Sequence, residues 1–198
     1  MDAELRAPLS PVCLIDGHLT EKEDVLWVRN PDRHLQNTTV ASSDGEKLFY
    51  VKGPGDYQSM TFRRPVKDPE GNAVFDLRRY AVDLKMRWFV QDSNEKKIAE
   101  LCHERFFTSK HTAINARICH SGEVVEMRPR DAQGSTCYVS IGNATIAEIT
   151  VHTNNTPKLI VRDRDMSVLR VRVARGVDLS LVVLMALVRA EMMHIWRK

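Results

Sequence analysis

Apolar and polar residues alternate with a period of two along much of the middle of the chain. Residues 84–88 read LKMRW, with apolar side chains at every second position, and Val171-Arg172-Val173 repeats the pattern. This alternation predicts β-strands with one buried face and one solvated face. The runs are separated by Gly, Asn, Asp and Pro, as in the turns at 43–45 and 69–72. Such punctuation, with no long amphipathic helix before residue 176, predicts an antiparallel meander rather than βαβ units.

The chain changes character at its C-terminus, where the predicted last strand ends at Gly176. Asp178 is of the residue type preferred at a helix N-cap, and every residue of Leu181–Val188 is apolar. A helix that is apolar on every side must be surrounded either by protein or by lipid.

Lipid is the weaker of these two alternatives. The charge-free stretch 179–188 is shorter than the ~20 residues that a membrane-spanning helix needs, and Arg189 and Glu191 follow it. A helix over 177–196 would be about 30 Å long at ~1.5 Å per residue, enough to thread a barrel. We therefore expect a mainly-β fold, a closed antiparallel β-barrel wrapped around a buried apolar C-terminal helix.

Two segments of the predicted meander resemble each other. Residues 43–52 and 69–78 each pair an acidic-Gly turn with a strand that carries an inward Phe, and 142–149 is a looser echo. Repeated hairpin sequences and true repeat ancestry explain this equally well. Both explanations predict hairpins at these positions.

Composition fits one globular domain. The chain has 198 residues, of which 43% are hydrophobic and 28% charged. We expect the barrel domain to span 25–198, and residues 1–24 to be an N-terminal arm or an additional edge segment. The net charge of +3 permits an acidic partner. It falls well short of the excess typical of nucleic-acid-binding proteins, so no nucleic acid is expected as a partner.

Two features predict a cytoplasmic protein, with peripheral attachment to a membrane as a further option. The N-terminus reads MDAELR, which is acidic and polar and lacks the basic start and apolar core of a secretory signal. The four cysteines are scattered without a short-spaced pair, as is typical of reduced thiols in an intracellular compartment.

The order of these features resembles the LURP-one-related family and its relatives, the tubby C-terminal domain and the phospholipid scramblases. The resemblance covers roughly residues 25–196, and the Gly-Val-Asp opening of the terminal apolar helix is its most specific part. The matching segments are 44–51, 70–79, Arg87-Trp88-Phe89-Val90, Ile146-Ala147-Glu148-Ile149 and Gly176-Val177-Asp178 leading into Leu181–Val188.

The resemblance implies a fold and a range of functions. The fold is a barrel of about twelve strands around a buried helix. For the tubby branch the resemblance implies binding of phosphoinositide head groups at a membrane surface. For the LURP-one-related branch it implies no settled biochemical activity, with some members linked to pathogen defence in plants. The chain carries no obvious match to a fixed ligand motif of the tubby branch.

A group of basic residues is expected on the outer face of consecutive strands. With a turn at 68–72, Arg63 lies across from Arg78; with a turn at 81–83, Arg78 lies beside Lys85, and Arg87 shares their face. Four cations on one face would suit a phosphate group or an acidic partner. The alternative is a solvated face neutralised by acids such as Asp76. Arg170 and Arg172 form a second stripe with the same two interpretations.

Motifs for metal binding and catalysis do not emerge from the sequence. Cys102-His103 and Cys119-His120 are adjacent pairs, and neighbouring residues on a strand point to opposite faces, so no metal and no cofactor are expected. We find no nucleophile elbow, helical His-Glu-His pattern, dinucleotide fingerprint or kinase signature. The protein is therefore expected not to be an enzyme, although a triad assembled from distant residues would be recognised only by its geometry.

Three functions fit the sequence. The first is a membrane-surface or adaptor module that presents Arg63, Arg78, Lys85 and Arg87 to anionic lipid or to an acidic protein. The second is a scramblase-like protein whose terminal helix enters the bilayer. The third is an enzyme with a pocket in the barrel. The first is favoured.

Overall fold

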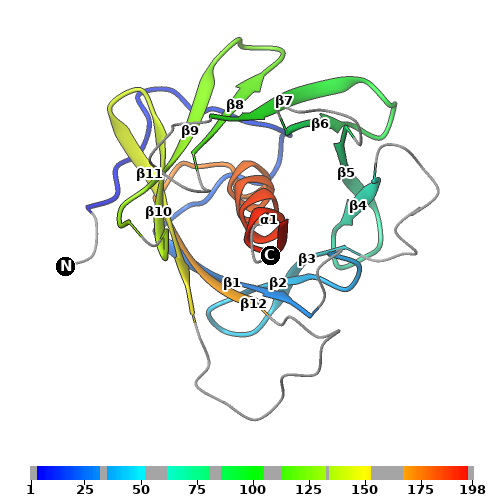
Figure 1. Cartoon of the computed structure of the whole chain (residues 1–198), viewed down its shortest axis with the longest axis horizontal. Coiled ribbons are helices and arrows are strands. Elements are labelled where there is room, and N and C mark those ends of the chain that lie inside the picture. Colours follow the sequence, from blue (N-terminus) through cyan, green and yellow to red (C-terminus); the bar gives the residue numbers. More distant parts are fainter. Residues whose placement is uncertain are drawn as a thin grey trace.

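The computed structural model describes residues 4–31, 35–51, 62–80, 86–104, 113–132, 134–152 and 167–195. Within these residues, twelve antiparallel strands close into a barrel around a C-terminal helix (Figure 1). The elements are β1 (Asp24–Asn30), β2 (Thr39–Ser42), β3 (Lys47–Val51), β4 (Arg64–Lys67), β5 (Ala73–Arg79), β6 (Arg87–Gln91), β7 (Lys97–His103), β8 (Ile114–Ile118), β9 (Val124–Pro129), β10 (Thr136–Ile141), β11 (Ala144–Val151), β12 (Ser167–Val173) and α1 (Leu179–Ile195).

The strands follow one another around the barrel in chain order, and β1 pairs with β12 to close it. Closure leaves no exposed sheet edge. Side chains alternate between the inside and the outside, most regularly along β12, where every second residue is buried. The inward residues form one hydrophobic core with the helix. The mainly-β barrel around a buried helix, as predicted, is confirmed.

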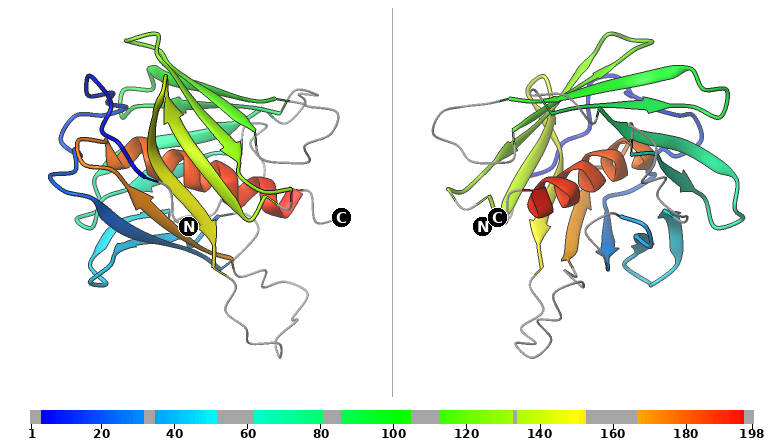
Figure 2. Two further views of the ribbon diagram at one scale, coloured as in Figure 1. Left: turned by 90° about the vertical axis from the view of Figure 1, so that its left-hand side faces the viewer. Right: turned by 45° about the vertical axis from the view of Figure 1, so that its right-hand side comes forward.

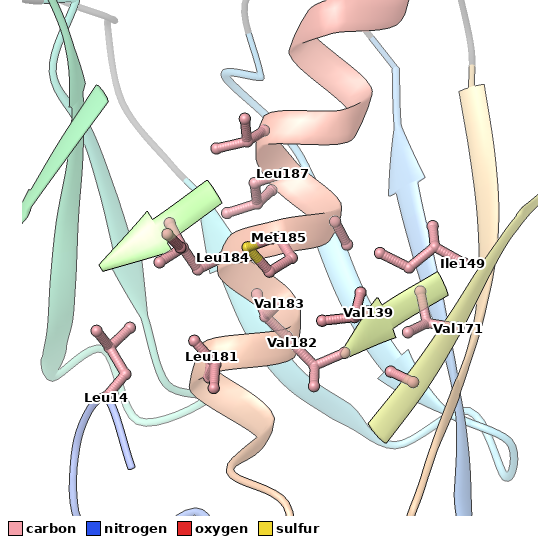
Figure 3. Close-up of a cluster of buried hydrophobic side chains, with 14 of the residues drawn as sticks. Leu14, Val139, Ile149, Val171, Leu181, Val182, Val183, Leu184, Met185 and Leu187 are labelled. Carbon is pink, nitrogen blue, oxygen red and sulfur yellow. The ribbon is translucent and has the colours of Figure 1, made fainter. Parts of the chain in front are cut away.

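Helix α1 runs through the middle of the barrel (Figure 2). Leu181–Val188 is fully buried: Val182 lies toward Val139 on one side of the helix, and Leu184 points to the opposite side (Figure 3). The helix begins at Leu179, directly after Asp178, the residue predicted as its N-cap. The backbone N–H of Ser180 donates to Asp178 Oδ1 at 2.8 Å.

The N-terminal segment packs across the end of the barrel at which the helix begins (Figure 2). Leu14 is buried there, and its backbone N–H donates to Asp178 Oδ2 at 2.6 Å. Thr20 is also buried; its hydroxyl donates to the Ala174 carbonyl at 2.8 Å. One carboxylate, that of Asp178, therefore caps the helix and holds the N-terminal segment against it.

Tight turns occur at the three predicted places, between β2 and β3, between β4 and β5, and between β10 and β11. In the second, Gly71 has a φ of 95°, a conformation that residues with a Cβ rarely adopt. The Asp68 carboxylate accepts hydrogen bonds from the backbone and side chain of Asn72, at 2.7 and 2.8 Å. The Asn72 side-chain bond, the larger of the two effects, holds the pKa of Asp68 below its usual range.

Candidate binding surface

Arg63, Arg78 and Arg87 lie on the outside of the barrel, at β4, β5 and β6 respectively. Arg63 directly precedes β4, Arg78 is the penultimate residue of β5, and Arg87 is the first residue of β6. These three neighbouring strands occupy one side of the barrel (Figure 1). We call Arg63, Arg78 and Arg87 the outer arginine face.

Asp76 lies between two members of this face. Its Oδ2 is 2.6 Å from a guanidinium nitrogen of Arg63 and 3.9 Å from one of Arg78. The Arg63 side chain is 47% exposed, whereas that of Asp76 is 10% exposed. The register Arg64↔Leu77 brings Arg63 beside Arg78, as the predicted turn requires. Asp76 was also anticipated as a neutralising acid, and it contributes one negative charge against two positive charges.

Arg78 is held less completely than Arg63. Its ion pair with Asp76 is long, and its Nε is buried without a hydrogen-bond partner. The side chain is 20% exposed. A guanidinium carries five N–H donors, and a buried donor without an acceptor is unfavourable. An oxyanion beside Arg63 and Arg78 would accept hydrogen bonds from the terminal nitrogens of their guanidinium groups.

Arg87 lies among aromatic side chains. Its guanidinium is 5.3 Å from the centre of the Tyr80 ring, and Tyr80 in turn packs against Phe89, with ring centres 4.8 Å apart and the rings tilted by 41°. Tyr80 is one of the exposed large side chains. A cation is attracted to the face of an aromatic ring, so Tyr80 helps to hold Arg87 in place.

The prediction that Lys85 pairs with Arg78 across a turn at 81–83 is wrong. The structure pairs Arg78 with Phe89 and Arg79 with Trp88, so the position opposite Arg78 lies four residues beyond Lys85. The reason is that β5 and β6 are joined by a longer connection than the three-residue turn at 81–83 that the sequence suggested. Lys85 itself lies outside the described residues.

A second charged group lies behind this face, inside the barrel. Glu191, near the end of α1, has a side chain that is 3% exposed. Its Oε1 accepts a hydrogen bond from Arg64 at 2.6 Å and lies 3.4 Å from Arg79. Its Oε2 accepts a hydrogen bond from the Trp88 indole N–H at 2.8 Å. We call Glu191, Arg64, Arg79 and Trp88 the inner Glu191 cluster.

Phe62 completes the surroundings of this cluster. Its ring lies 4.6 Å from the Arg79 guanidinium carbon, and its carbonyl oxygen accepts a hydrogen bond from Arg64 at 3.1 Å. A buried carboxylate requires paired cations and hydrogen-bond donors, and the cluster provides them.

The inner Glu191 cluster was not predicted, although the sequence contains two signals for it. Glu191 sits on a helix that is apolar all round, and a carboxylate in such a helix needs a buried partner. The basic residues at β4 and β5 come as adjacent pairs, 63–64 and 78–79, and alternation turns one member of each pair inward.

A cavity of about 460 Å³ lies at the opposite end of the barrel, where the N-terminal segment packs. Its lining includes Cys13, Asp16, His18, Asp68 and Asp92. Burial, followed by the charges of Asp178 and Asp16, raises the pKa of the Cys13 thiol. A raised thiol pKa lowers the thiolate fraction at neutral pH, so Cys13 is not an activated nucleophile. Asp68 and Asp92 use their oxygens in the hydrogen bonds of their own turns.

Other charged groups are paired locally. Arg172, in the second predicted basic stripe, lies 2.7 Å from Glu23. On the surface of β7, Glu100 accepts a hydrogen bond from Lys97 at 2.9 Å, which raises the pKa of that lysine.

In the described part of the chain, no three His, Cys, Asp or Glu side chains gather as a metal ion would require. None of the described helices is long and apolar enough to cross a membrane.

Residues 26–190 match the family model described as LURP-one-related. The chain belongs to this family. An X-ray structure of a protein from Arabidopsis thaliana is similar to this LURP-one-related chain, with a TM-score of 0.60 and 17% identity. The likeness covers 91% of this chain and 96% of the plant protein, and at this identity it shows a shared fold. Among curated proteins, none matches the chain.

Proposed function

We propose that this LURP-one-related protein is a non-enzymatic, cytoplasmic module that binds phosphoinositide head groups at a membrane surface through its outer arginine face. The observation that carries the proposal is the incomplete pairing of Arg78. Its guanidinium shares the Asp76 carboxylate with Arg63 at the long distance of 3.9 Å, and its buried Nε has no acceptor. One phosphate group can accept two hydrogen bonds from one guanidinium, which fits the incomplete pairing of Arg78.

The position of the face also suits a membrane surface. Arg63 is half exposed and Tyr80 is exposed beside Arg87, so cations and an aromatic ring are offered together. Aromatic rings favour the interfacial region of a bilayer, and basic residues are attracted to anionic lipids.

A membrane-inserted, scramblase-like function is less well supported. Helix α1 supplies the centre of the hydrophobic core, with Leu181–Val188 fully buried by the strands. Withdrawal of the helix into a bilayer would expose the inward faces of all the strands, and a domain's stability margin of ~5–15 kcal/mol is far too small for that.

Vesicle co-sedimentation tests the proposal. The vesicles are phosphatidylcholine alone, phosphatidylcholine with phosphatidylinositol bisphosphate, and phosphatidylcholine with phosphatidylserine at the same total charge, each at low and at physiological salt. We expect the wild type to bind the phosphoinositide vesicles best. The double variant Arg63→Glu/Arg78→Glu should bind at least about tenfold more weakly, since each basic residue near an anionic surface is worth about 1 kcal/mol.

The matched control is Arg29→Glu/Arg117→Glu, which makes the same charge change at exposed positions of β1 and β8, outside β4 to β6. If both double variants lose binding equally, the attraction is one of overall charge and the outer arginine face is not a site. If the wild type binds no vesicle, the lipid proposal is wrong and an acidic protein becomes the partner to seek.

A further inference from the structure

Among the described strand residues, the three that form an ion pair or hydrogen bond with Glu191 each directly follow a member of the outer arginine face in the chain. The pairs are Arg63 and Arg64 at β4, Arg78 and Arg79 on β5, and Arg87 and Trp88 on β6. One carboxylate of the helix is thus bound to three consecutive strands, at the positions next to the three outer arginines.

Strand geometry transmits this contact from the inside to the outside. Successive side chains on a strand point to opposite faces, and their Cα atoms are ~3.8 Å apart. A side chain that is fixed by a short hydrogen bond inside therefore fixes the direction in which the preceding side chain leaves the barrel. The contacts are 2.6 Å to Arg64 and 2.8 Å to Trp88, and the Glu191 side chain is 3% exposed, so little freedom is left at this point.

We propose that Glu191 is a positioning residue for the outer arginine face, setting the spacing of Arg63, Arg78 and Arg87 from within the barrel. As a statement about lipid recognition, this rests on the proposed function. It refines that function, because a fixed spacing of guanidinium groups recognises the several phosphates of one phosphoinositide head group. A diffuse cationic surface would respond to charge density alone.

The test compares Glu191→Gln, which keeps the shape of the side chain and removes its charge, with wild type. Glu191→Asp, which keeps the charge and withdraws it by one methylene, is the second variant in case the first does not fold. The matched control is Val183→Ala, a core substitution in the first half of α1 that destabilises the barrel without touching the cluster.

The first measurement is the NMR signals of the arginine Nε–Hε groups. Glu191→Gln should shift or broaden the signals of Arg63, Arg78 and Arg87, whereas Val183→Ala should leave them in place. Unchanged signals of the outer arginines in a folded Glu191 variant would overturn the inference, whatever the vesicles show.

The second measurement is binding to the two kinds of anionic vesicle. Glu191→Gln should weaken binding to phosphatidylinositol bisphosphate vesicles by roughly 2- to 30-fold and leave binding to phosphatidylserine vesicles nearly unchanged. In the Arg63→Gln/Arg78→Gln background the same substitution should have no further effect. Equal losses on both vesicles, or an undiminished loss in that background, would contradict positioning. Shifted arginine signals without vesicle binding by the wild type would reject the lipid function and retain Glu191 as the residue that orders the face.

Discussion

At β4 and β5, two arginines share one carboxylate on the outer face of the barrel, and two others share one on the inner face. Outside, Arg63 and Arg78 share Asp76; inside, Arg64 and Arg79 share Glu191. The four arginines form two adjacent pairs in the sequence, 63–64 and 78–79, and the members of each pair differ in their surroundings. Arg63 is 47% exposed, whereas Arg64 is 6% exposed.

The two groups differ in how far solvent can screen their charges and replace a lost partner. Outside, solvent screens the charges and can replace a lost partner, so the face is free to bind a ligand. Inside, Glu191 and Arg64 are almost fully buried, so their charges depend on each other, on Arg79 and on the Trp88 N–H rather than on solvent. The same residue types are therefore expected to serve binding on one face and architecture on the other.

The largest effect is expected where the interior receives a charge with no partner. Leu184→Asp places a carboxylate in the middle of α1, among apolar side chains. Its desolvation would exceed the ~5–15 kcal/mol stability of a typical domain, so the barrel should not fold. Circular dichroism and thermal unfolding check this, with Leu184→Met as the control that keeps volume and polarity. A soluble, cooperatively folded Leu184→Asp protein would mean that the helix is not central to the fold.

The second largest effect is the difference in stability between removing Glu191 and removing Asp76. Glu191→Ala leaves the buried Arg64 guanidinium and the partly buried Arg79 guanidinium without their carboxylate and should lower the free energy of unfolding by about 3–5 kcal/mol. Asp76→Ala removes the outer acid and should cost at most about 1 kcal/mol. Urea unfolding followed by tryptophan fluorescence gives both values. Similar losses for the two variants would show that burial does not distinguish the groups.

A smaller effect distinguishes the two arginines of β4. Arg64 donates to both the Phe62 carbonyl and Glu191, which a lysine cannot do in the same geometry. Arg64→Lys should therefore cost about 1–3 kcal/mol of unfolding free energy, and Arg63→Lys should stay within about 0.5 kcal/mol of wild type. Chemical denaturation is again the measurement. A neutral Arg64→Lys variant would indicate that the charge alone matters inside the barrel.

The smallest effect is that of salt. Between about 0.01 M and about 1 M ionic strength the Debye length falls from about 30 Å to about 3 Å. The coupling energy between Arg63 and Asp76, from a double-mutant cycle, should decline over this range. The coupling between Arg64 and Glu191 should stay nearly constant because solvent ions do not reach it. Parallel declines would contradict the view that the inner cluster is sealed.

Much of this architecture could be predicted from residue patterns. The alternation of Val171–Val173 predicts a strand, found as β12, and the apolar Leu181–Val188 predicts a surrounded helix, found as α1. The strand predicted from the alternation at 84–88 begins only at Arg87, and 84–85 lie outside the described residues. Asp178 was predicted as the helix N-cap, and its contact with Ser180 confirms this. These features depend on local geometry and on the hydrophobic effect, which act through neighbours in the chain.

The tertiary structure alone decided which charges meet. The sequence predicts that Arg63 and Arg78 share an outer face. The predicted partner of Arg78 on the next strand was wrong by four residues, because the alternation within strands does not determine the length of the connection between them. The union of Glu191 with Arg64 spans 127 positions of the chain. Nothing local specifies such a pair; it forms because closing the barrel brings the last turns of the helix against β4 to β6, and a buried carboxylate is stable there only beside cations.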